Sequence, residues 1–93
     1  MKNGNRKVYV QVDVIFTAEG HMRPNFITWE DGNSYGIERV RAVRPVYAVG
    51  AGSIGDRYTV IVEGREKYLY FERNTRYDSK TIGRWFVEKR EGA

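Results

Sequence analysis

Residues 46–64 read VYAVGAGSIGDRYTVIVEG, and residues 50–55 within them match the G-x-G-x-x-G fingerprint of dinucleotide-binding folds. That fingerprint works only where a helix begins at its last glycines, because the helix N-terminus holds the pyrophosphate of the cofactor. Here residues 56–62 are rich in β-branched and aromatic side chains, which favour a strand, and Gly64 closes the run before a useful helix could form. We therefore interpret residues 48–56 as a glycine-rich loop between two strands, and we expect no bound cofactor.

The spacing of the next apolar run supports this interpretation. Only residues 64–67 separate the expected strand at 57–63 from the apolar residues at 68–71. A parallel crossover needs about a dozen residues or more. The two strands are therefore expected to be antiparallel neighbours that a tight turn connects.

Period-two alternation of apolar side chains dominates the rest of the chain and predicts strands rather than helices. The expected strands cover residues 7–16, 26–29, 35–46, 57–63, 68–73 and 84–88. Asp31-Gly32 lies between two apolar runs and predicts a hairpin turn. Six short strands joined mainly by tight turns predict an all-β fold. We expect a small six-stranded antiparallel barrel or a strongly curled sheet, with an SH3-like barrel as the first choice and an OB-like barrel as the second.

Three local features refine this prediction. The apolar spacing slips between Ile37 and Val40, which predicts a β-bulge near residues 38–39. Pro24 is expected to end the loop that precedes the second strand, and Pro45 is expected at a sheet edge, because proline cannot donate to a strand ladder.

One face of the expected strands forms the core, and Trp29 and Trp85 are interpreted as packing anchors within it. The residues assigned to this face are Val8, Val10, Val12, Val14, Phe16, Ile27, Trp29, Ile37, Val40, Tyr58, Val60, Val62, Leu69, Phe71, Trp85 and Val87.

The composition limits the kind of protein this can be. A chain of 93 residues makes one domain, 1–93, and we expect residues 1–6 and 90–93 to fray. There are no cysteines, which excludes disulfides and thiolate metal sites. No window approaches the ~18 apolar residues of a membrane span, and the N-terminal residues lack the apolar segment of a signal peptide. We expect a cytoplasmic protein without a membrane partner.

The residues that carry chemistry are sparse. His21 is the single histidine, so a zinc site of three or four His and Cys ligands is excluded. Glu30 and Asp31 are adjacent at a strand end, where they belong to the turn and do not form an acid–base pair. We assign no catalytic, cofactor-binding or metal-binding residue, and we expect a protein that is not an enzyme.

The outward face of the expected sheet is more apolar than a solvent-exposed face should be. The candidate binding face consists of aromatic residues flanked by arginines: Tyr9, Arg57, Tyr68, Tyr70, Arg73, Arg84 and Phe86. Three explanations compete. The tyrosines pair across strands, or the face is buried against a second copy, or the rings stack on bases while the arginines hold phosphates.

The charge distribution bears on the last explanation. Residues 1–34 are balanced, so residues 35–93 carry the whole net charge of +4. Arg39, Arg41 and Arg44 lie close together on the expected third strand. They are interpreted mainly as charges that discourage edge pairing, with phosphate positioning as the alternative.

Three functions follow as hypotheses. The first is protein–protein interaction or self-association, in a homo-oligomer or with another protein, through Tyr68, Tyr70 and Phe86 or through a strand edge. The second is weak, sequence-tolerant binding of single-stranded nucleic acid. The third is a small-molecule site near the glycine loop.

The chain also resembles small uncharacterised bacterial proteins known as hypothetical open reading frames. The resemblance covers most of the chain from residue 8 onward. The matching stretches are PNFITWEDG at residues 24–32, Tyr35, Val40, RYTV at residues 57–60 and RWFV at residues 84–87. These are mainly core and turn positions, so the resemblance implies a shared fold and carries over no functional residue.

Overall fold

The computed structural model describes residues 5–49, 53–74 and 81–90. Within these ranges, seven strands form one antiparallel sheet in the order β3-β2-β1-β7-β6-β5-β4. The strands are β1 (Asn5–Phe16), β2 (Met22–Thr28), β3 (Ser34–Gly36), β4 (Arg39–Val49), β5 (Ser53–Val62), β6 (Arg65–Arg73) and β7 (Gly83–Arg90). The prediction of an all-β fold is confirmed.

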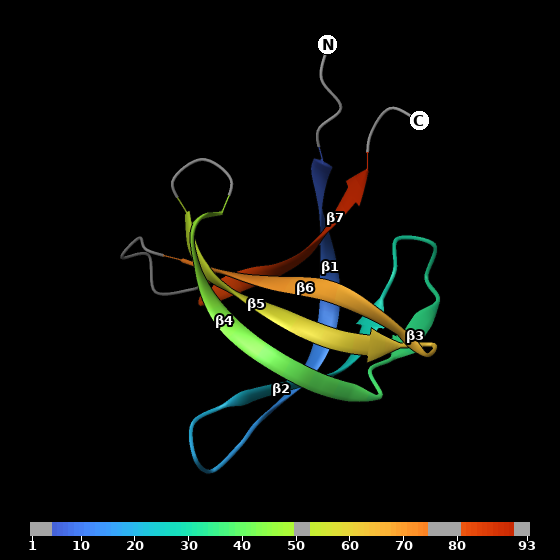
Figure 1. Ribbon diagram of the computed structural model, residues 1–93, viewed down its shortest axis with the longest axis horizontal. Helices are drawn as coiled ribbons and strands as arrows, with labels where there is room; N and C mark the ends of the chain where they lie inside the picture. The colour runs from blue at the N-terminus through green and yellow to red at the C-terminus, as the bar shows by residue number, and fades with distance from the viewer. Residues whose placement is uncertain (1–4, 50–52, 75–80, 91–93) are drawn as a thin grey trace.

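The sheet curls strongly into a half-barrel, as Figure 1 shows. Its two edge strands, β3 and β4, follow each other directly in the chain, and the two residues between them connect opposite ends of the sheet. The backbone N–H of Ile37 donates to the carbonyl oxygen of Asn25 in β2 at 2.7 Å. The backbone N–H of Glu38 donates to the carbonyl oxygen of Ile61 in β5 at 2.8 Å. This short link holds the two ends of the curled sheet together.

The glycine fingerprint is not followed by a helix. β5 begins at Ser53 and continues through Val62, so the prediction of a strand rather than a helix after the glycines is confirmed. The expected loop at 48–56 is too long, however, because both flanking strands extend into it. Gly55 is buried inside β5, opposite Glu72 of β6. Residues 50–52 of the expected loop lie outside the described residues.

Two turns show why the hairpins form where they do. Glu63 and Gly64 both have positive φ, 52° and 73°, as a two-residue hairpin turn with the twist of its strands requires. The turn expected at 64–67 is therefore shorter, and β6 begins at Arg65. The turn predicted at Asp31-Gly32 is confirmed: Gly32 has a φ of 88°, and the backbone N–H of Asn33 donates to Oδ1 of Asp31 at 2.9 Å.

The strand count, the position of the bulge and the prediction for Pro24 need correction, whereas Pro45 lies in the edge strand β4 as expected. The expected third strand at 35–46 is divided by the link at residues 37–38 into β3 and β4, which gives seven strands instead of six. The bulge lies between Val40 and Ala42, slightly later than expected. Pro24 does not precede the second strand but lies buried within it, where the ladder with β1 shifts register. At such a shift the ladder hydrogen bonds are interrupted, so a proline, which has no backbone N–H to donate, is tolerated there.

The core lies on the concave side of the sheet. Its buried members are Ile27, Tyr58, Val60, Val62, Leu69, Phe71 and Trp85, all of which were assigned to the core. The assignment of Phe16 was wrong: its side chain is 71% exposed, because it lies near the tip of the β1–β2 hairpin, beyond the core. Strand pairing also continues to Asn5 and Arg90, which were expected in frayed ends.

Candidate functional site

The strand register aligns aromatic residues in a row across the outward face of the sheet. Tyr9 of β1 lies opposite Phe86 of β7, Phe86 lies opposite Tyr70 of β6, and Tyr70 lies opposite Arg57 of β5. Cross-strand neighbours share a face of the sheet. We call the outward surface formed by Tyr9, Arg57, Tyr68, Tyr70, Arg84 and Phe86 the aromatic–arginine face. It contains six of the seven residues of the candidate binding face.

Phe86 is the centre of this face and is completely buried. Its ring stacks on Tyr70 with centroids 4.9 Å apart and planes 4° apart, and Tyr9 approaches it edge-on at 5.8 Å. Such aromatic pairs stabilise by about 0.5–1.5 kcal/mol beyond the area they bury. Phe86 is therefore an internal support of the face rather than a surface that a partner could contact.

Three cations cover the rings of this face. The guanidinium carbon of Arg84 lies 3.8 Å from the centroid of Tyr9, and that of Arg57 lies 4.4 Å from the centroid of Tyr68. The ammonium of Lys7 lies 4.8 Å from the centroid of Phe86. Lys7 was not among the predicted site residues, although its alternation with Tyr9 in β1 places it on the same face.

The tyrosine hydroxyls and the carboxylates of this face are paired with each other. Tyr9 donates its hydroxyl proton to Oε1 of Glu72 at 2.8 Å, and the Lys7 ammonium forms an ion pair with Oε2 of the same carboxylate at 3.1 Å. Tyr70 donates to Oε1 of Glu88 at 3.3 Å. The carboxylates of Glu72 and Glu88 thus both accept hydrogen bonds from neighbouring side chains.

The arginines differ in their electrostatic environment. Within the described residues, Arg57 and Arg84 form no ion pair with a carboxylate, and Nε of Arg57 is buried without a hydrogen-bond partner. Arg39 and Arg44 join the same face, because the bulge after Val40 restores their alignment with Ile61 and Arg57. The outward surface of β4, β5 and β7 therefore carries cations that no described acid neutralises.

Arg73 is the member of the candidate binding face that lies elsewhere. It alternates with Leu69 and Phe71 of β6 and therefore belongs to the core side of the sheet. There its guanidinium contacts both carboxylate oxygens of Asp56, at 3.0 and 3.1 Å. The prediction that Arg73 joins the tyrosines was wrong.

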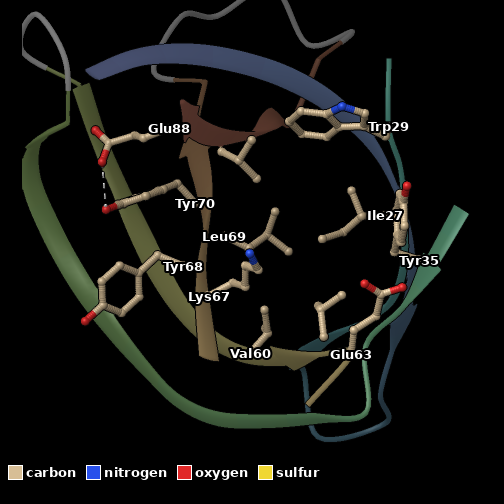
Figure 2. A pocket seen from close by; sticks show the side chains of 12 residues that line it. Ile27, Trp29, Tyr35, Val60, Glu63, Lys67, Tyr68, Leu69, Tyr70 and Glu88 are labelled. Atoms are coloured by element: carbon tan, nitrogen blue, oxygen red, sulfur yellow. Dashed lines mark hydrogen bonds between the residues drawn. The ribbon is translucent and has the colours of Figure 1, made fainter. Parts of the chain in front are cut away.

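A pocket of about 560 Å³ opens on the concave side of the sheet (Figure 2). Ile27 and Tyr35 line it on the β2–β3 side, and Val60 and Leu69 line it from β5 and β6. It contains no residue of the expected glycine loop, so it is a different location from the predicted small-molecule site. Among the described residues, no group of three or more His, Cys, Asp or Glu side chains could hold a metal ion.

No helix in the part of the chain that the structure describes is long and apolar enough to cross a membrane. Comparisons of the chain with protein-family models, with curated proteins and with solved structures find no match. The function must therefore be argued from the geometry of the two faces.

The Tyr70–Glu88 pair predicts how stability changes at alkaline pH. Burial and the neighbouring Glu88 carboxylate raise the pKa of Tyr70 above its ordinary value of 10.0. The folded state then holds the phenolic proton more tightly than the unfolded state does. This contribution to stability is complete below about pH 10 and is lost as the pH rises through the raised pKa.

As the pH rises from about 9 to about 11, the unfolding free energy should fall less in Tyr70→Phe than in the wild type. The reason is that phenylalanine has no phenolic proton to lose. Urea unfolding across this range measures the difference. An identical decline in both proteins would show that Tyr70 does not titrate differently in the folded and unfolded states.

Proposed function

We propose that this protein is a non-enzymatic binding module whose aromatic–arginine face binds single-stranded nucleic acid with little sequence preference. The observation that carries the proposal is a pair of guanidinium groups, Arg57 and Arg84, that lie over tyrosine rings and have no carboxylate partner among the described residues. The proposal assumes the cytoplasmic location that the sequence predicts.

Stacking on a ring suits these arginines for binding phosphate. A guanidinium that lies over Tyr9 or Tyr68 is already restricted in orientation, so less side-chain entropy is lost when a phosphate binds. A guanidinium group that no carboxylate engages can still bind two phosphate oxygens at once. Since β5 and β7 are separated only by β6, the two strands are about 10 Å apart, and Arg84 is offset from Arg57 by two residues along β6. One short extended strand can contact both.

The exposed tyrosines supply the second component. Tyr9 and Tyr68 are 41% and 47% exposed, so a base can stack on the part of each ring, or on the guanidinium, that faces solvent. Base–aromatic stacking contributes about 1–3 kcal/mol per base and tolerates any sequence. Of the two acids, Glu72 opposes phosphate only weakly because it pairs with Lys7, whereas Glu88 keeps its charge while it accepts from Tyr70.

Replacing both arginines tests this proposal. We expect the double variant Arg57→Gln/Arg84→Gln to bind a labelled oligothymidylate at least about tenfold more weakly than the wild type at low salt. The slope of log K against log salt should fall by about 1.4, that is, about 0.7 for each phosphate that an arginine no longer neutralises. Fluorescence anisotropy over a salt series measures both quantities.

The chain offers a matched control with the same loss of charge. Arg23 and Arg65 are both exposed and lie outside the aromatic–arginine face. Arg23→Gln/Arg65→Gln should keep most of the affinity and the wild-type salt slope. Wild-type protein that does not bind at low salt, or two double variants that behave alike, would contradict the proposal.

Self-association is a second candidate, which a different observation favours. Phe16 is 71% exposed, and Ile15 and Phe26 on the same β1–β2 hairpin are also exposed. Burying such side chains against a second copy releases apolar surface from water. The β4 edge is a weaker candidate for this contact, because a bulge and Pro45 interrupt it and arginines flank it.

We expect the wild type to sediment as a dimer at micromolar concentration and Phe16→Ser to sediment as a monomer, because the variant loses the most exposed apolar side chain of the hairpin. Tyr68→Ser, on the aromatic–arginine face, should remain dimeric. A monomeric wild-type protein would exclude self-association through the hairpin.

A further inference from the structure

The pocket exists because two neighbouring strands separate. The β6–β7 ladder extends only from Tyr70↔Phe86 to Arg73↔Gly83. Beyond Tyr70, β6 continues in pairing with β5, while β7 continues beyond Phe86 in pairing with β1. The sheet therefore opens between β6 and β7, and the pocket lies where the two strands part.

The floor of this pocket is apolar. Val60 and Leu69 are completely buried, and Ile27 is nearly so. Figure 2 shows these three side chains pointing into the space between the β2–β3 side and β6. A volume of about 560 Å³ with an apolar floor is in the range of sites that hold small organic molecules.

The wall formed by Trp29 and Tyr35 differs from the aromatic residues on the outward face. Both side chains are half-buried and line the pocket. Within the described part of the chain, neither forms a side-chain hydrogen bond or a ring contact. An indole N–H, a phenol O–H and the exposed part of each ring therefore remain available to a ligand, although Tyr35 also packs against the core.

The charges at the rim favour a cation. Glu63 lines the pocket next to the β5–β6 turn, Glu88 lines it from β7, and Lys67 is the single basic residue among the lining residues. Glu63 forms no ion pair within the described residues. In Figure 2 its carboxylate lies on the same side of the pocket as Tyr35. A carboxylate beside a partly exposed aromatic ring attracts an ammonium group through charge and through the ring face.

We propose that this pocket binds a small organic cation with a flat apolar body. The body packs on Ile27, Val60 and Leu69 beside the ring of Trp29, and the ammonium group lies at the rim near Glu63 and Tyr35. This pocket shares Tyr68 and Tyr70 with the aromatic–arginine face, but the residues that carry the present proposal, Glu63, Trp29 and Tyr35, lie outside that face.

Three ligands with one ring system test the charge of the ligand directly. Tryptamine, indole and indole-3-acetate share a flat body and are cationic, neutral and anionic at neutral pH. We expect tryptamine to shift the backbone amide resonances of Ile27, Val60 and Leu69 in a ¹H–¹⁵N titration of the wild-type protein. It should bind about fivefold more tightly than indole-3-acetate, with indole between them.

Two variants assign the charge effect to one residue. Glu63→Gln should weaken tryptamine binding by about two- to fivefold, the range of an exposed ion pair, and should leave indole unchanged. Lys67→Met, which removes a like charge, should not weaken tryptamine binding. Arg84→Gln should leave all three ligands unaffected, because neither Arg84 nor the ring of Tyr9 beneath it lines the pocket, and this separates the result from the outcome of the oligonucleotide experiment.

Three results would overturn the proposal. One is the absence of amide shifts in the pocket with tryptamine at millimolar concentration. Another is tighter binding of indole-3-acetate than of tryptamine, which would identify an anion site around Lys67. The third is unchanged tryptamine affinity in Glu63→Gln.

Discussion

The close approach of three strands around Phe71 is the constraint on which the rest of this structure depends. A Cβ on Gly55 of β5 would collide with the carbonyl oxygen of Phe71, and a Cβ on Gly83 of β7 would meet both the carbonyl oxygen of Glu72 and the ring of Phe71. Glycine at both positions lets β5 and β7 press against β6 from its two sides. Glycines that permit close backbone approach are typical of places where a sheet bends sharply.

The close packing of β5, β6 and β7 around Phe71 also determines which side chains meet on each face of the sheet. On the concave side, the ring of Phe71 packs against Trp85 at 4.9 Å, and Trp85 packs against Tyr58 at 5.1 Å, which builds the core. On the outward side, the same register places Phe86 opposite Tyr70. Where the ladder ends, β6 and β7 separate and open the pocket. One short ladder therefore determines the core, the aromatic–arginine face and the pocket.

The sequence predicts the parts of this structure that local patterns control. Alternation in residues 7–16 predicts β1, and Asp31-Gly32 predicts the turn between β2 and β3. Alternation along β6 also places Arg73 on the opposite face from Tyr70, so the sequence contains the signal that corrects their grouping. The role of Gly55 was not predictable, because a glycine that permits close packing looks the same in sequence as a glycine in a loop. The pocket gives no local signal either, because it depends on where a ladder between distant strands ends.

The stability of Gly55→Ala tests the central claim most directly. Gly36 provides the matched control, because a Cβ there meets nothing within 4 Å and its φ is not positive. If close approach of β5 to Phe71 holds the curled sheet together, Gly55→Ala should lose at least about 2 kcal/mol of unfolding free energy in urea. Gly36→Ala should stay within about 0.5 kcal/mol of the wild type. Equal stability of the two variants would contradict this account.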